Sequence, residues 1–338
     1  MTYVLGVDGG ASKTIALVAT SEGEIVGSGR RGGSSIYEGE PAAMLANAVD
    51  ACHDALMMAG IIAPQVSSSV FSMSGADWPE DFALIRETFA GHGLGRRMTV
   101  VNDAVGGLRA GSATGPAVAV ICGTGAGTAA RGADGRIWHS SFWQGGGGAV
   151  DLTRQGLRAV YRAELGTARP TALTGAVLAF TGFETVEALL HHLTARESVP
   201  VLRYAGFARV LLDIAMDGDS VARKIVSAFG RELGDDALAG ARQVGITHLP
   251  FTLVLGGSVF KHPEPLLAGT LTARVREVAP AVTVVRSTFE PVVGALQLAF
   301  DEIGASTATS AAIARSWERH RDRVLAIPSP STDASNTR

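Results

Sequence analysis

The first residues of this chain that could do chemistry are an acid, two glycines and three phosphate-binding side chains that follow an apolar segment. Asp8 comes after the mostly apolar residues 3–7, and the run continues with Gly9, Gly10, Ala11, Ser12, Lys13 and Thr14. Glycines let the main chain approach phosphate oxygens closely, and hydroxyl and ammonium groups donate hydrogen bonds to them. An Asp-Gly pair between two apolar runs is also a strong hairpin signal. Both interpretations hold together if a phosphate site is built on the turn.

Three more apolar segments end in the same way. Asn102 and Asp103 follow one of them, a Gly-Thr-Gly-Ala-Gly turn follows residues 117–122, and a Gly-Gly-Ser turn follows residues 252–255. The residues that the two turns offer to a nucleotide are Gly123, Thr124, Gly125, Gly127, Gly256, Gly257 and Ser258. Ligands bind at the carboxyl ends of the strands of an open sheet. We therefore expect these four strand ends to meet at one cleft.

In order and with similar spacing over about residues 3–302, these motifs resemble the N-acetylglucosamine kinase-like branch of the BadF/BadG/BcrA/BcrD ATPase family. The segments that carry the resemblance are residues 8–14, 74–77, 102–104, 123–127, 205–207, 218–219, 256–259 and 291–296. The family belongs to the superfamily of actin, the heat-shock chaperone ATPases and the hexokinases. The resemblance implies an α/β fold of two actin-like ATPase (ribonuclease H-like) domains with a cleft between them.

The resemblance also implies ATP and Mg²⁺ as cofactors and assigns roles to residues. Asp103 matches the catalytic base of the family, and Asp8 would organise Mg²⁺ through its waters. Residues 9–14 and 123–127 would clasp the phosphates, and residues 256–258 would pass under adenosine. The residues expected on the substrate side are Ser35, Tyr37, Gly75, Asp77, Asn102, Asp103, Gln144, Gly145 and Asp151.

Some of these acids also have a purely structural interpretation. Asp103 could be the N-cap of a helix over residues 104–110, a position that Asp fills well, and a base role can coexist with that cap. Asp77 and Glu80 could likewise cap the helix that begins near Pro79. Asp151 could simply be an acid in the first turn of its helix.

The sequence departs from the family pattern where the sugar is expected. The family carries Gly-Asp-Glu-Gly-Ser-Gly where this chain has residues 144–149, Gln-Gly-Gly-Gly-Gly-Ala, so both acids are missing. Asp151 is close enough in sequence to compensate. The family asparagine that contacts sugar is replaced at Ser34 and Ser35, with Tyr37 near a family aromatic. Because discrimination depends on buried polar partners, the same sugar preference is not expected.

Composition excludes several other classes of protein. The chain has 338 residues, 46% of them hydrophobic, and a net charge of −3, which offers no electrostatic basis for nucleic-acid binding. Cys52 and Cys122 lie in apolar patterns, so neither a disulfide nor an iron–sulfur motif is indicated. No secretory signal and no apolar run of about 20 residues is present, which predicts a cytoplasmic protein.

Hydrophobic periodicity predicts the domain organisation. We expect one domain over residues 1–116 and a second with a helical insertion over 117–290. The family resemblance implies that a helix over 291–302 packs back on the first domain. In the second domain, residues 201–216 are expected to form one helix. A C-terminal helix over 303–326 should be exposed and charged, with Trp317 as an anchor, and the polar tail 327–338 should be disordered.

Two classes of function remain. The first is an ATP-dependent kinase that phosphorylates a hydroxyl of an amino sugar or a related polyol. The second is a BadF/BadG-type ATPase, or a sugar- or nucleotide-responsive protein, without sugar kinase activity. For the kinase we predict a sugar-like substrate, no nucleic-acid or membrane partner, and a homodimer.

Overall fold

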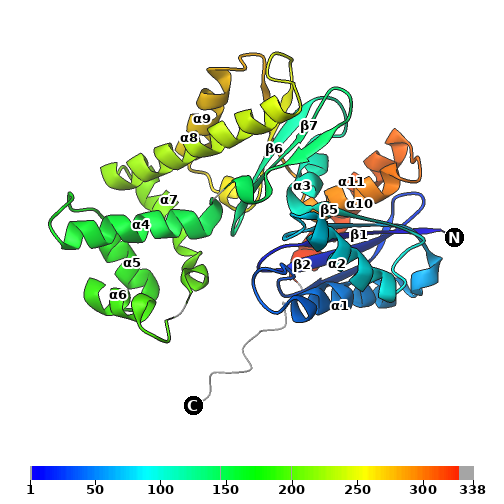
Figure 1. Ribbon diagram of the computed structural model, residues 1–338, viewed down its shortest axis with the longest axis horizontal. Coiled ribbons are helices and arrows are strands. Elements are labelled where there is room, and N and C mark those ends of the chain that lie inside the picture. Colours follow the sequence, from blue (N-terminus) through cyan, green and yellow to red (C-terminus); the bar gives the residue numbers. More distant parts are fainter. Residues whose placement is uncertain (1, 145, 199, 327–338) are drawn as a thin grey trace. The chain divides into compact units, whose positions relative to one another are not determined.

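The computed structural model describes residues 2–144, 146–198 and 200–326, and it divides the chain into two compact units. Unit 1 comprises Met1–Thr114 with Ser287–Arg338, and unit 2 comprises Gly115–Arg286. The predicted tail 327–338 and Gly145 lie outside the described residues. Figure 1 shows a sheet with flanking helices in each unit.

Unit 1 is built on a five-stranded sheet in the order β3-β2-β1-β4-β5. The strands are β1 (Tyr3–Gly9), β2 (Thr14–Thr20), β3 (Ile25–Arg31), β4 (Val66–Met73) and β5 (Arg97–Asn102). The first three form an antiparallel meander, whereas β4 and β5 run parallel to β1. This arrangement places the carboxyl ends of β1, β4 and β5 at one edge of the sheet.

Alternating residues of β1 and β2 face two separate cores. Leu5 and Val7 pack in the cluster that contains helix α1 (Pro41–Ala59) and helix α2 (Pro79–Gly91). Val4 faces the other cluster, formed with α10 (Pro291–Asp301) and α11 (Thr307–Ala326). The period of two is that of a strand buried on both faces. A Cβ on Gly6 would lie 2.3 Å from the backbone nitrogen of Leu296, so α10 packs directly against β1.

Unit 2 repeats the same strand order, β10-β9-β6-β7-β8. Its strands are β6 (Ala117–Cys122), β7 (Ala126–Arg131), β8 (Ile137–His139), β9 (Thr252–Gly256) and β10 (Thr283–Arg286). Again the first three are antiparallel, and the last two are parallel to the first. The duplicated α/β fold predicted from the sequence is therefore confirmed.

The helices of unit 2 lie mainly between β8 and β9 in the chain. They are α4 (Gly148–Glu164), α5 (Leu173–Thr181), α6 (Val186–Thr194), α7 (Phe207–Met216) and α8 (Ser220–Gln243), with α9 (Pro265–Arg276) after β9. Within the described residues no single helix is long and apolar enough to cross a membrane. Only α5 and α6 together, bent by 59° at their junction, pass that test by length and composition.

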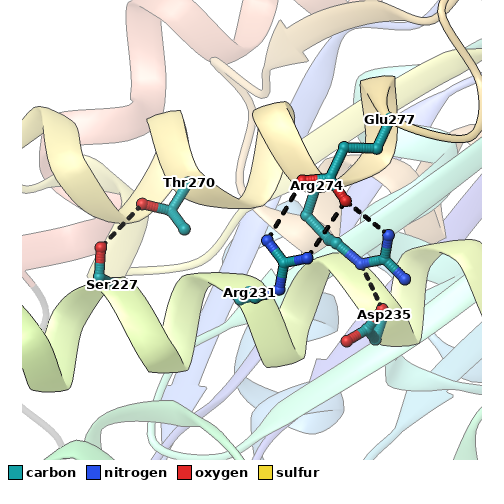
Figure 2. A network of polar contacts seen from close by, with 6 residues as sticks. All are labelled: Ser227, Arg231, Asp235, Thr270, Arg274 and Glu277. Carbon is teal, nitrogen blue, oxygen red and sulfur yellow. Dashed lines mark hydrogen bonds and ion pairs between the residues drawn. The ribbon is translucent and has the colours of Figure 1, made fainter.

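Helices α8 and α9 pack closely through small residues and surface charges. A Cβ on Gly230 would lie 2.7 Å from the Leu267 carbonyl oxygen, so only glycine permits this approach. Figure 2 shows the surface network, in which Arg274 donates to Asp235 at 2.6 Å and to Glu277 at 2.8 Å. These acids are about half-exposed, so their pairs contribute little stability.

Two helix predictions are corrected by the structure. The helix expected over residues 201–216 is divided into a short 3-10 turn, Val201–Tyr204, and α7, with Gly206 between them. The C-terminal helix is not merely exposed, because Ile313, Trp317 and Val324 are buried in the core of unit 1. The expected Trp317 anchor is confirmed. The cluster of charged residues that follows Trp317 obscured the buried stripe in the sequence.

Candidate functional site

The acidic edge of the unit 1 sheet begins at the β1–β2 hairpin. Gly9 pairs with Thr14, and the Gly10 nitrogen donates to the Lys13 carbonyl at 2.9 Å, so Ala11 and Ser12 form the turn. The predicted hairpin is therefore confirmed, but Asp8 and Gly9 are the last two residues of β1, and the turn follows them at residues 10–13. A Cβ on Gly9 would lie 2.4 Å from the Ser34 hydroxyl. The glycine is thus required by packing, whatever it binds.

The hydroxyl of Thr14 is used inside unit 1. It is fully buried and donates to the Gly32 carbonyl and to the Ser34 hydroxyl, both at 2.8 Å. Ser35 is also buried, directly beyond this contact. Thr14 therefore fastens the segment around Ser34 and Ser35 to the hairpin. The phosphate role expected for Thr14 remains a prediction.

Asp8 lies at the end of β1 with only 8% of its surface exposed. Burial is the main cause that raises its pKa to about 7, and the negative charges of Asp103 and Glu290 raise it further. The positive charge of Lys13 partly offsets this by lowering the pKa of Asp8. Asp8 is therefore a carboxyl in an acidic, poorly hydrated environment, as expected of a group that meets a cation.

Asp103 is the first residue of α3 (Asp103–Gly111), and its carboxylate is not the cap of that helix. The N-cap is Asn102, whose side-chain oxygen accepts from the Ala104 nitrogen at 3.1 Å. The alternative that Asp103 caps the helix is therefore wrong. Burial and the charge of Asp77 raise the pKa of Asp103 to about 6. This leaves a proton acceptor at the sheet edge.

The turn after β4 joins this edge through Asn102. The Asn102 side-chain nitrogen donates to the Asp77 carboxylate at 2.9 Å and to the Ala76 carbonyl at 3.3 Å. Gly75 has φ of +87°, a conformation that favours glycine, and a Cβ there would lie 3.3 Å from the Tyr37 ring. The structure therefore brings Asn102, Asp103, Asp77, Gly75 and Tyr37 into one neighbourhood.

The capping role expected for Asp77 and Glu80 belongs to another acid. Asp81 accepts from the Trp78 nitrogen at 2.8 Å, at the start of α2, and from the Tyr37 hydroxyl at 2.9 Å. Tyr37 is half-exposed and is held at this end of the helix. Three acids lie within five residues at this helix start, so the sequence did not show which of them caps it, and the Tyr37 hydroxyl, 44 residues away from Asp81, left no local signal.

Glu290 is a further residue that sequence analysis missed. It occupies the N-cap position of α10, its side chain is 11% exposed, and its carboxylate lies 3.4 Å from the Lys13 ammonium. The only sequence signal is an acid directly before Pro291 at a helix start. Glu290 adds a third carboxylate beside Asp8 and Asp103 and holds the ammonium group expected to bind phosphate.

In unit 2 the turn after β6 supports the start of α4. The Ala149 nitrogen donates to the Gly123 carbonyl at 2.8 Å and the Val150 nitrogen to the Thr124 carbonyl at 3.1 Å. A Cβ on Gly148 would lie 2.4 Å from the Gly125 carbonyl oxygen. The glycine run before α4 is therefore partly explained by close packing on this turn.

The Gly-Gly-Ser turn after β9 lies beside the same strand end. Gly257 has φ of +94°, and a Cβ there would lie 2.3 Å from the Cys122 carbonyl oxygen at the end of β6. Gly256 is buried, whereas Ser258 is exposed. The unit 2 residues expected to bind phosphate and those expected to bind adenosine thus lie side by side in the fold.

Gln144 is held by two hydroxyls at the end of the β8 connection. Its side-chain oxygen accepts from Thr128 and from Ser140, each at 3.0 Å, while its side-chain nitrogen is buried and has no partner among the described residues. An added Cβ on Gly146 would lie 2.9 Å from the Asp151 carboxylate. Asp151 therefore reaches back to the glycine loop, as expected if it compensates for the missing acids.

Comparison with known proteins identifies the family of this chain. The model of the BadF/BadG/BcrA/BcrD ATPase family matches residues 5–299. The chain belongs to this family. An N-acetylmuramic acid/N-acetylglucosamine kinase from Clostridium acetobutylicum is 25% identical over 266 residues, which are 78% of this chain and 87% of the relative.

Solved structures show the same fold. A structure described as a candidate N-acetylglucosamine kinase from Chromobacterium violaceum matches with a TM-score of 0.69 and 22% identity, covering 88% of this chain and 99% of that one. A counterpart from Porphyromonas gingivalis matches with a TM-score of 0.67 and 19% identity, covering 90% and 100%. At these identities the likeness establishes the fold alone.

Membership in an ATPase family implies use of ATP, and the turn after β6 fits a nucleotide. An added Cβ on Gly123 or Gly125 would meet no atom within 4 Å, so the protein itself does not require glycine at either position. A phosphate group can approach the main chain closely where glycines leave the backbone amides uncovered next to open space.

The acids of unit 1 fit a divalent cation. Mg²⁺ takes oxygen ligands and is usually held by one or two carboxylates together with substrate phosphates. Among the residues that the structure describes, no group of three His, Cys, Asp or Glu side chains forms a metal site. Asp8, whose pKa is raised by burial and by neighbouring acids, matches the sparser arrangement of one or two carboxylates.

Proposed function

We propose that this BadF/BadG/BcrA/BcrD family member is an ATP-dependent kinase that phosphorylates a hydroxyl of an amino sugar or a related polyol. The observation that carries the proposal is Asp103. Asn102, not Asp103, occupies the N-cap position of α3, and the pKa of Asp103, about 6, lies near neutrality. A carboxylate with these properties can accept a proton at neutral pH.

Asp103 is assigned the role of general base. The acceptor oxygen forms a bond to the γ-phosphorus, the bond from that phosphorus to the bridging oxygen of ADP breaks, and the acceptor proton passes to the Asp103 carboxylate. Asn102 orients this edge through its bonds to Ala104 and Asp77. Positioning and proton acceptance are most of what a kinase must supply.

Nucleotide binding is assigned to the loops of both units. In unit 1 the donors are the backbone of Gly9 and Gly10 and the side chains of Ser12 and Lys13. In unit 2 they are the backbone of residues 123–127, with residues 256–258 next to adenosine. Asp8 is assigned to Mg²⁺, which when bound neutralises charge on the β- and γ-phosphates.

The acceptor is assigned to Ser35, Tyr37, Gly75, Asp77, Asn102, Gln144 and Asp151, with Gly145 outside the described residues. The named activity of the Clostridium acetobutylicum relative supports an amino sugar. Loss of both loop acids supports a changed preference among amino sugars. Assembly as a homodimer and a cytoplasmic location remain predictions.

ATP turnover over a panel of sugars, amino sugars and cyclitols, with a no-acceptor control, tests the proposal. ADP release that depends on one acceptor supports a kinase, and release at the same rate without any acceptor would contradict it. An activator-type ATPase with an iron–sulfur cluster is not favoured, because Cys52 and Cys122 are both buried free cysteines in different units.

A further inference from the structure

Three helices in the described part of the chain begin with the same pair of residues, a glutamate at the N-cap followed by a proline. They are α1 at residues 40–41, α9 at 264–265 and α10 at 290–291. The Glu40 side chain accepts from the Ala43 nitrogen at 2.9 Å, and the Glu264 side chain accepts from two backbone nitrogens of α9. Within the residues that the structure describes, the Glu290 side chain accepts no such bond from α10.

Glu290 is used instead by the β1–β2 hairpin of the same unit. Its carboxylate lies 3.4 Å from the Lys13 ammonium, although only 9% of the residue is exposed. A side-chain cap stabilises a helix because it satisfies a backbone N–H that has no partner inside the helix. Capping explains Glu40 and Glu264, whereas Glu290 is explained by its pair with a residue 277 positions away.

This pair changes what the sheet edge offers to a phosphate group. The charges of Lys13, Asp103 and Glu290 all act on Asp8, so the four groups share one electrostatic environment. An ammonium that already balances a buried carboxylate attracts phosphate less strongly, and the surrounding acids repel metal-free ATP. When Mg²⁺ accompanies the nucleotide, its charge offsets this repulsion, and the other N–H groups of Lys13 can reach the phosphates.

We propose that Glu290 is a positioning residue that makes nucleotide binding depend on Mg²⁺. It holds the Lys13 ammonium at the hairpin and balances its charge, so Lys13 contributes little to the binding of metal-free ATP. The inference rests on the nucleotide site of the proposed function and adds the residue that selects the magnesium complex over the free nucleotide. It is independent of which acceptor is phosphorylated.

Calorimetric titration of the full-length protein with ATP, once in Mg²⁺ and once in EDTA, tests the proposal. Glu290→Gln keeps the shape of the side chain and removes its charge. ATP binding in EDTA should become roughly tenfold tighter, the scale of one partly buried charge pair, while binding in Mg²⁺ should change by less than about threefold. The ratio of the dissociation constant in EDTA to that in Mg²⁺ should therefore fall.

Glu40→Gln is the matched control, because it makes the same change at the same helix position, where the side chain does act as a cap. It should leave the ratio of the two dissociation constants at the wild-type value. A merely structural role for Glu290 would lower the melting temperature and weaken ATP binding equally in both conditions. The ratio therefore separates positioning of Lys13 from an effect on folding.

Lys13→Met tests the pair from its other side and does not require the Glu290 variant. Because Glu290 already balances Lys13, this variant should weaken ATP binding roughly tenfold in Mg²⁺ and by less than about twofold in EDTA. In the double variant, Lys13→Met should cancel the tighter binding that Glu290→Gln produces in EDTA, since Glu290 acts through Lys13. If Glu290→Gln does not fold, the two affinities of Lys13→Met decide the question alone.

The outcomes distinguish this inference from the proposed function. A folded Glu290→Gln protein with the wild-type ratio would overturn the inference, as would equal weakening by Lys13→Met in both conditions, or tighter binding in EDTA that persists in the double variant. If the ratio changes as expected but no acceptor stimulates ADP release, the positioning role stands and the kinase proposal fails. If turnover depends on an acceptor and the ratio keeps its wild-type value, only the positioning role fails.

Discussion

Replacing Asp103 by asparagine should make the enzyme slower and the fold more stable. The change keeps the size of the side chain, and the Asn102 cap of α3 remains, so local structure should be preserved. Turnover should fall by ~100-fold or more, the usual scale for a lost general base. ATP binding should be retained, because Asp103 is not among the groups assigned to phosphate.

The stability gain follows from the raised pKa of Asp103. Its pKa is about 6 in the folded protein against an ordinary value of 3.8, so the folded state holds the proton more tightly than the unfolded state. The ionised carboxylate of Asp103 therefore destabilises the folded protein. This free-energy cost is absent below about pH 4, grows as pH rises, and is complete above about pH 6. Two pKa units correspond to at most ~3 kcal/mol, which the asparagine variant would recover at pH 8.

The assay compares initial rates of ADP release and urea unfolding of both proteins at pH 4.5 and pH 8. The stability difference should be larger at pH 8, and wild-type kcat/KM should rise as pH increases through about 6 to 7, where Asp103 and Asp8 ionise. Turnover of Asp103→Asn within a few-fold of wild type would refute the base assignment. A variant that is less stable than wild type at pH 8 would refute the electrostatic reasoning.

Three further predictions concern the nucleotide and the acceptor. Asp8→Asn should weaken ATP binding in the presence of Mg²⁺ and change it little in EDTA; equal affinities with Mg²⁺ would remove Asp8 from the metal role. Gly125→Ala should raise the KM for ATP with an unchanged melting temperature, because the added Cβ meets only open space. Gly257→Ala should instead lower the melting temperature, because φ of +94° and the Cys122 carbonyl oxygen, 2.3 Å from the added Cβ, both oppose a side chain. N-acetylglucosamine should be a poor acceptor, by roughly ten- to a hundredfold for one missing charge-assisted hydrogen bond. Efficient and selective phosphorylation of it, with Asp151→Ala harmless, would show that the loop acids were never needed.

The duplicated sheets could be predicted from the sequence because their signals are local. The apolar strands β1, β5, β6 and β9 end at or directly before a glycine or an acid. Helix α1 begins at Pro41 and ends before Gly60, where φ is +65°. Strand period, proline at a helix start and glycine at its end all act over a few residues. The same holds for the hairpin between β1 and β2, although its turn lies at residues 10–13, directly after the Asp8-Gly9 pair.

The partners of the site residues could not be predicted, because they join distant parts of the chain. Lys13 and Glu290 are 277 residues apart, and Tyr37 and Asp81 are 44 apart. Either acid could be taken for an ordinary helix-start residue in the sequence. The role of each acid, in capping a helix or in chemistry, depends on partners that come close only when the sheet has formed.

The assignment of helix capping to some polar residues, and not to Asp103, is the observation that most favours a proton-transfer site. Asn102 takes the cap of α3 and Asp81 takes the start of α2, which leaves the carboxylates of Asp103 and Asp77 to the sheet edge. Burial and the neighbouring charge of Asp77 raise the pKa of Asp103 to about 6, so the ionised carboxylate of Asp103 does not stabilise the fold. Such an arrangement costs folding free energy, and binding of an acceptor hydroxyl at Asp103 is the function that we expect to offset it.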